Sequence, residues 1–120
     1  MHIEGDASLL RVFIGESDKH EHKALHDVIV QEARAHGLAG ATVLRAIGGY
    51  GLSARVRSTR ILDLSSDLPV VVEIVDEEAK IIDFLVRLNE LLEETNAGGL
   101  VTLEKAHIIR YLEGGSSATS

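Results

Sequence analysis

Hydrophobic residues in this chain form two patterns: short continuous runs, and longer stretches with an apolar residue every three or four positions. The short runs are rich in β-branched residues, which predicts strands. Four main strands are expected, at Leu9–Ile14, Ala41–Ile47, Val70–Val75 and from Leu100 to about Tyr111, with Ile61–Leu64 as a short extra strand. Because the third run is apolar at nearly every position, it predicts a central strand that is covered on both faces.

Two stretches with helical spacing separate these strands. The first predicts a helix at His22–Ala35, with Ser17 or Asp18 as its cap and Gly37 as its C-terminal stop. The second follows Asp76, which we expect to be the N-cap, and ends at Asn96–Gly99. Its apolar stripe is the strongest in the chain and is expected at Ile81, Leu85, Leu88 and Leu92, flanked by Ile82, Phe84 and Leu91.

The predicted order is strand–helix–strand, a long loop, and strand–helix–strand again. Two interleaved right-handed βαβ units of this kind form an α+β, ferredoxin-like βαββαβ sandwich, with two helices on one face of a four-stranded antiparallel sheet. The apolar residues of the other face must then be hidden against another subunit. We expect one domain at residues 9–112, between a flexible N-terminus (1–8) and a disordered tail (113–120).

A glycine-rich hinge and a basic loop join the two halves. Three glycines surround Tyr50 directly after an apolar run, so the backbone can turn tightly there and approach another molecule closely. The segment Leu52–Arg60 then carries Arg55, Arg57 and Arg60 and no acidic residue. This pattern is typical of a loop that binds an anion or a partner, and it also fits a plain hairpin loop.

The composition narrows the function classes. Twelve Lys and Arg against nineteen Asp and Glu give a net charge of −7, which argues against non-specific nucleic-acid binding. The absence of cysteine excludes a thiolate metal site and a Cys nucleophile. Because the chain has neither a membrane-length apolar segment nor a signal-peptide pattern, we expect no membrane insertion and a cytoplasmic location.

Histidines near the first predicted helix are the best metal candidates. His22 and His26 are four residues apart and would share a helix face, with His20 just ahead of them. No distant third ligand is evident, so a solvated surface is the simpler interpretation. Because no nucleophile-elbow motif is present either, we expect neither a metal nor catalytic residues.

Several ordered motifs connect the chain with a known family. They are Phe13-Ile14-Gly15-Glu16, Asp18-Lys19-His20, Gly40-Ala41-Thr42-Val43, Gly49-Tyr50-Gly51 and the run Leu68–Asp76. With them, nearly the whole chain resembles the PII-like family catalogued as domain of unknown function 190, and it is more distantly similar to the PII nitrogen-regulatory proteins. The resemblance implies a trimer with inward-facing sheets, adenine nucleotides in the clefts between subunits, and a long loop that contacts enzymes or transporters.

The resemblance also implies a set of nucleotide-binding residues. They are Phe13, Thr42, Gly49, Tyr50, Gly51, Glu73, Val75 and Arg110. For Glu73 the alternative is an ion pair with Arg11 or Arg45 across the sheet. The turn Thr95–Leu100 is shorter than the phosphate loop of PII proteins and lacks its lysine, so we expect AMP, ADP or a cyclic nucleotide rather than ATP.

The implied function is a non-catalytic PII-like regulator that requires no cofactor and controls a partner, such as a membrane transporter, through loop 49–60. Two alternatives stay open. One is a small metal-binding protein or enzyme that uses His20, His22 and His26. The other is a purely structural oligomer.

Overall fold

The computed structural model of the chain describes residues 5–51 and 68–114. The elements in these two segments are β1 (Gly5–Gly15), β2 (Lys19–His20), β3 (Lys23–Ala24), α1 (Leu25–Ala35), β4 (Thr42–Arg45), β5 (Pro69–Asp76), α2 (Glu78–Thr95) and β6 (Leu100–Ile108). The predicted strand at Ile61–Leu64 lies outside the described residues. Neither described helix is long and apolar enough to cross a membrane.

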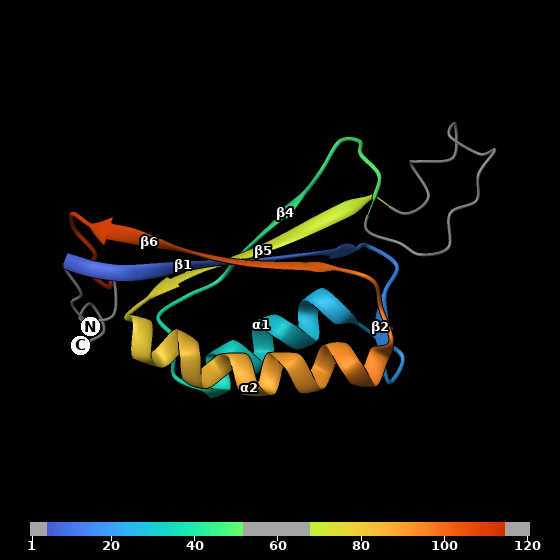
Figure 1. The fold of residues 1–120 in the computed structure, drawn as a ribbon, viewed down its shortest axis with the longest axis horizontal. Coiled ribbons are helices and arrows are strands. Elements are labelled where there is room, and N and C mark those ends of the chain that lie inside the picture. The colour runs from blue at the N-terminus through green and yellow to red at the C-terminus, as the bar shows by residue number, and fades with distance from the viewer. Residues whose placement is uncertain (1–4, 52–67, 115–120) are drawn as a thin grey trace.

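The main sheet has the predicted ferredoxin-like topology. Its strand order is β4-β5-β1-β6, and all three neighbouring pairs are antiparallel. Both described helices lie on the same face of this sheet, so neither of them covers the opposite face (Figure 1). The α+β fold predicted from the order of apolar runs is therefore confirmed, and the sheet has one covered face and one open face.

The core lies between the covered face and the two helices. In β1 and β5 every second residue points into it, because strand side chains alternate between the two faces. The fully buried aliphatic residues of these two strands are Leu10, Val12, Ile14, Val70, Val72 and Ile74. The prediction of a central strand at β5 is confirmed, but coverage on both faces is wrong for the single chain. Val71 and Glu73 are only partly buried, and Val75 is exposed, because no helix lies over them.

Helix α2 presents a slightly different face to the core from the one predicted. Ile81 and Leu88 are fully buried as expected, whereas Leu85 and Leu92 are only partly covered. Phe84 and Leu91, two of the expected flanking residues, complete the buried stripe. The spacing of three and four residues allows two overlapping stripes on this helix, and the position of the sheet above it selects between them.

Asp76 has a different role from the predicted helix cap. It ends β5 as a fully buried carboxylate, and the N-cap is Glu77. Its Oδ1 accepts a hydrogen bond from the Glu77 N–H at 2.7 Å, and its Oδ2 accepts one from the Ala39 N–H at 2.8 Å. Asp76 therefore fastens the loop after α1 to the start of α2.

A small hairpin replaces the predicted first turn of α1. β2 and β3 pair through Lys19 with Ala24 and His20 with Lys23, so the helix begins at Leu25 and not at His22. Glu21 and His22 form the turn with φ of 51° and 74°. Glycine usually occupies such positive-φ positions, so the sequence gives no local signal for this turn. The N-cap is Ala24 rather than Ser17 or Asp18. Asp18 instead accepts a hydrogen bond from the Gly15 N–H at 2.9 Å.

The C-terminal ends of both helices agree with the sequence. Gly37 follows α1 with φ of 81°, and the Leu38 N–H donates to the Ala33 carbonyl at 3.1 Å, as in a Schellman motif. Asn96 ends α2 in the left-handed conformation.

Three strand boundaries differ from the prediction. β1 begins at Gly5, because its first residues pair with the end of β6, so residues 5–8 belong to the sheet. β4 is limited to Thr42–Arg45 and β6 ends at Ile108, both shorter than expected. Among the described strands these two lie at the edges of the sheet, where each pairs with one neighbour.

Candidate functional site

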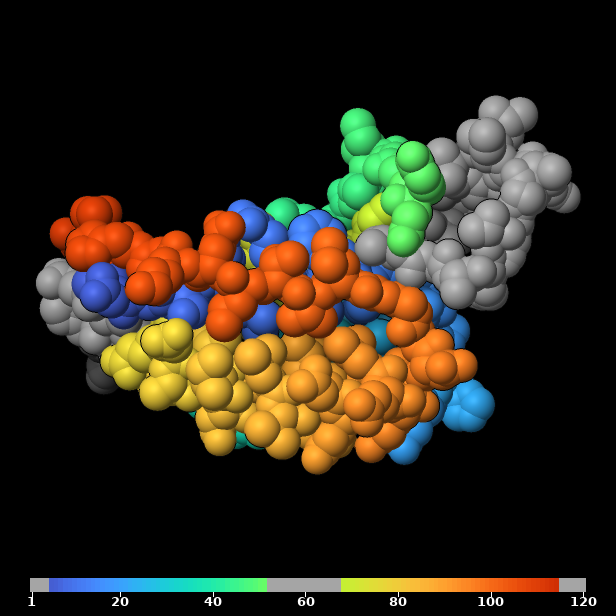
Figure 2. All heavy atoms as spheres, in the orientation of Figure 1, coloured from blue at the N-terminus to red at the C-terminus, as the bar shows by residue number. Residues whose placement is uncertain are grey.

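The hinge predicted from the glycines has a backbone that favours glycine. Gly49 and Gly51 have φ of 147° and 111°, in the region that L side chains rarely adopt. A Cβ atom on Gly49 would also approach the Cγ of Pro69 to 3.2 Å. Ile47 and Tyr50 are almost completely exposed beside these glycines. Figure 2 shows the atoms of β4 and the hinge, in green, projecting beyond the packed helix–sheet body.

The two ends of the long loop are joined at their base. The Ala46 N–H donates to the Pro69 carbonyl at 2.9 Å, and the Glu16 N–H donates to the Leu68 carbonyl at 2.8 Å. An ion pair connects Arg45 with Glu16. The loop arginines Arg55, Arg57 and Arg60, which carry the predicted partner contact, lie outside the described residues.

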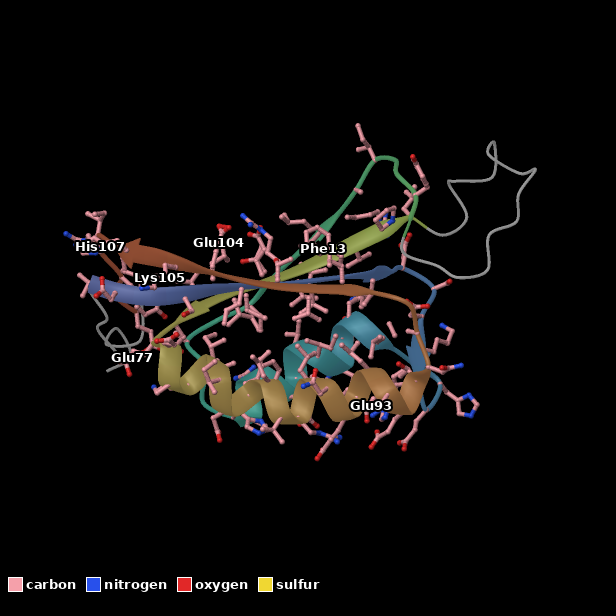
Figure 3. The ribbon with its side chains drawn as sticks, in the orientation of Figure 1. Phe13, Glu77, Glu93, Glu104, Lys105 and His107 are labelled. Carbon is pink, nitrogen blue, oxygen red and sulfur yellow. The ribbon has the colours of Figure 1, made fainter. Side chains whose placement is uncertain are left out.

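The open face has an ordered pattern of side chains. By register, its residues are Leu9, Arg11, Phe13, Thr42, Leu44, Val71, Glu73, Val75, Leu100, Thr102 and Glu104. Leu44, Val71, Phe13 and Leu100 lie side by side and form an apolar row across all four strands. The neighbouring row, Thr42, Glu73, Arg11 and Thr102, is polar. Figure 3 shows Phe13 and Glu104 on the side of the sheet away from the helices.

An ion pair occupies the middle of the polar row. The Arg11 Nε donates to Glu73 Oε2 at 2.9 Å, and an Arg11 terminal nitrogen lies 3.6 Å from Glu104 Oε1. The hydrogen bond to Glu73 raises the pKa of Arg11. Of the two partners that the sequence allowed for Glu73, Arg11 is therefore confirmed, whereas Arg45 pairs with Glu16. Within one chain, Glu73 has a structural partner.

The residues implied by the resemblance divide between two ends of the sheet. The register places Gly15 opposite Pro69, beside the hinge, whereas Leu9 lies opposite Val75 and Gly5 opposite Ile108. From Pro69 to Val75 the strand covers about 20 Å, at about 3.3 Å a residue. Arg110 follows β6 and is exposed at this far end. Phe13, Thr42 and Glu73 lie between the two ends on the open face.

The predicted histidine cluster does not form a metal centre. His20 Nε2 lies 2.8 Å from Glu94 Oε1 and connects the hairpin to α2. His22 is exposed in the turn, and His26 Nδ1 lies 3.3 Å from Asp27 Oδ1. In residues 5–51 and 68–114, no group of three or more potential metal ligands converges.

A polar hollow of about 360 Å³ lies between this hairpin and the two helices. Its lining residues are His20, Glu21, Lys23, Val28, Gln31, Glu32, Arg87 and Glu94. Arg87 donates to Glu32 Oε1 at 3.2 Å and to Glu90 Oε1 at 3.0 Å. These bonds raise the pKa of Arg87, with that to Glu90 contributing most. Since most of its charged groups satisfy one another, the hollow is best explained as part of the helix–hairpin packing.

Two solved structures of PII-like proteins are similar to this chain. A PII-like protein from Thermus thermophilus has a TM-score of 0.61 at 19% identity, over 88% of this chain and 91% of that one. CPII from Thiomonas intermedia, in a structure bound to ADP, AMP and acetate, has a TM-score of 0.60 at 14% identity, over 92% of this chain and 93% of that one. These likenesses show that the chain has the PII-like fold.

Sequence comparison places the chain within a family. The family model DUF190, described as "Uncharacterized ACR", matches residues 7–108. A UPF0166 protein of Aquifex aeolicus is 45% identical over 101 residues, 84% of this chain and 91% of that protein. A UPF0166 protein of Methanocaldococcus jannaschii is 33% identical over 104 residues, 87% of this chain and 93% of that protein. The chain belongs to the DUF190 family, which confirms the resemblance seen in its motifs.

Proposed function

We propose that the chain is a non-catalytic, cytoplasmic PII-like regulator that works as a homotrimer. The three open faces turn inward, and a small adenine nucleotide binds in each cleft between neighbouring subunits. Nucleotide binding selects a conformation of loop 49–60, which acts on a partner such as a membrane transporter or an enzyme. A ligand drives such a switch only if it binds the two loop states with different affinity.

The observation that carries this proposal is the division of the implied site between two ends of one sheet. The hinge at Gly49 and the exposed Arg110 lie at opposite ends, so one chain cannot bring them together. A second copy that docks on the open face can supply the missing half. The apolar row through Phe13 favours covering that face, because an exposed apolar patch of this kind usually marks an interaction surface.

The ligand class is supported by the fold relative. CPII is bound to ADP and AMP in one of its solved structures. We propose AMP, ADP or a cyclic nucleotide for this chain, with Phe13, Thr42, Gly49, Tyr50, Gly51, Glu73, Val75 and Arg110 as its contacts. The turn from α2 to β6 is shorter than the phosphate loop of PII proteins and lacks the lysine of that loop. We therefore do not expect it to hold a triphosphate.

Isothermal titration with ATP, ADP, AMP, cyclic AMP and cyclic di-AMP tests this function. We expect saturable binding of one nucleotide per subunit. Gly49→Val should weaken it, because valine is strained at the φ of this position and its side chain would press on Pro69. Gly114→Val is the matched control, since its Cβ would meet nothing within 4 Å. Absence of binding by all five nucleotides would contradict the proposal. A preference for ATP that is lost in Arg110→Ala would overturn the choice of nucleotide.

A further inference from the structure

The ends of all four strands of the main sheet lie at the hinge end, in the order β4-β5-β1-β6. Gly15 pairs with Pro69, and Phe13 pairs with Leu100. Gly99 packs so closely on β1 that a Cβ there would lie 2.9 Å from the Phe13 carbonyl oxygen. In the described segments that meet here, 13–16, 45–51, 68–70 and 97–100, the single cationic side chain is Arg45.

Glu16 contacts both stems of the long loop, which are the outgoing segment that includes Arg45 and the returning segment that begins at Leu68. Its backbone N–H donates to the Leu68 carbonyl on the returning stem, at 2.8 Å. Its carboxylate pairs with Arg45 on the outgoing stem. The side chain of Arg45 is nevertheless 65% exposed, so part of its guanidinium remains open to solvent. A guanidinium presents several N–H donors in a planar fork that fits carboxylate and phosphate equally well.

We infer that Arg45, on the edge strand β4 beside the hinge, is a phosphate contact of the nucleotide site, and that Glu16 occupies this contact when no nucleotide is bound. This inference rests on the proposed function, since it assigns the anionic part of the same ligand. A phosphate group that reaches the hinge takes the place of the Glu16 carboxylate on the Arg45 guanidinium. The two stems then lose one of the bonds that join them, while the Glu16 N–H bond to Leu68 has no need to break.

The exchange distinguishes this role from that of a simple surface ion pair. If the Arg45–Glu16 pair only joined the two stems, removing either residue would change nucleotide affinity in the same direction. If Arg45 binds phosphate, the two partners have opposite effects, because Glu16 competes with the ligand and Arg45 attracts it. The phosphate also matters by itself, since adenosine has the same base and sugar without the anion.

The experiment is isothermal titration of the full chain and its variants with ADP, AMP and adenosine. For Arg45→Gln we expect about tenfold weaker binding of ADP and AMP, because the variant loses one charge-assisted hydrogen bond to the phosphate. For Glu16→Gln we expect several-fold tighter binding of both nucleotides. Adenosine affinity should stay within about twofold in both variants. Arg34→Gln, an exposed arginine at the end of α1, is the matched control and should not change any affinity.

The outcomes separate the inference from the proposed function. Opposite shifts for Arg45→Gln and Glu16→Gln, limited to the phosphate-bearing ligands, support the exchange. Unchanged ADP and AMP affinity in Arg45→Gln, or equal weakening in both variants, overturns the inference and leaves the nucleotide function standing. Failure of the unmodified chain to bind any of the three ligands overturns both. Circular dichroism of each variant checks that the substitution leaves the fold intact.

Discussion

The two faces of the sheet differ in composition and in what they pack against. On the covered face, β1 and β5 present only aliphatic residues along the middle of the strands, and all are fully buried by the helices. The open face has a comparable apolar row but places the Arg11–Glu73 ion pair beside it. An aliphatic face fits any apolar surface, whereas a row of paired charges and threonines fits a surface with matching polar groups.

This difference assigns the two faces separate roles. The covered face supplies the stability of the single chain, because burial of aliphatic side chains is the main favourable contribution to folding. The open face supplies specificity for the molecule that covers it, which we propose to be further copies of this chain. Substitutions on the two faces should therefore change different measured properties.

Phe84→Ala should have the largest effect on stability. Phe84 is fully buried on α2 beneath the sheet, and its ring also meets that of His36 edge-on at 5.5 Å. We expect the free energy of unfolding to fall by about 3–5 kcal/mol in urea titrations. Val86→Ala, on the exposed side of the same helix, is the control and should cost less than about 1 kcal/mol. Equal losses for the two variants would contradict the assignment of the core.

Asp76→Ala should come next. The substitution removes the acceptors of the Ala39 and Glu77 N–H groups in a fully buried place. We expect a loss of about 2–3 kcal/mol in the same titrations. Asp76→Asn keeps one oxygen acceptor and should lose less. If the Ala variant were as stable as the unmodified chain, the loop after α1 would not depend on this carboxylate.

Phe13→Asp should separate assembly from folding. Phe13 is only partly buried in the single chain, so we expect a modest loss of about 1 kcal/mol in the unfolding of the monomer. The introduced charge should nevertheless abolish assembly, measured by size-exclusion chromatography with light scattering. Ile82→Asp, on exposed surface of α2, should leave the mass of the assembly unchanged. A trimer that persists in Phe13→Asp would exclude the open face as the interface.

His20→Ala should have the smallest effect of the four. It removes the 2.8 Å contact with Glu94 that ties the β2–β3 hairpin to α2, away from both faces of the sheet. Because Glu94 is exposed, we expect a loss below about 1 kcal/mol. Nickel or zinc that remained bound to the purified protein and was absent from His20→Ala would instead revive the metal hypothesis.

The order of elements could be predicted from the sequence because each apolar run has a clear period. The covered face of β1 and β5 alternates strictly, and the ends of both helices are marked by Gly37 and Asn96. The start of α1 was missed, because Glu21 and His22 adopt a turn that glycine or asparagine usually signals. Asp76 was misassigned because a carboxylate before a helix usually caps it.

The candidate site was less predictable than the fold. The glycine pattern around Tyr50 identified the hinge, but the separation of Gly49 from Arg110 follows from strand register, which local sequence does not specify. From charge alone, the sequence allowed either Arg11 or Arg45 as the ion-pair partner of Glu73. The strand register selects Arg11, which lies directly opposite Glu73. The pairing of Arg45 with Glu16 was not foreseen, since these residues are far apart in the sequence.

The central claim is that the nucleotide binds between copies that meet through the open face. Native mass spectrometry of the unmodified chain and of Phe13→Asp, each mixed with ADP, tests it most directly. For the unmodified chain we predict three subunits with up to three ADP molecules, and for Phe13→Asp a folded monomer without ADP. A monomer that retains ADP, in either protein, would contradict the account, because the site would then be complete within one chain.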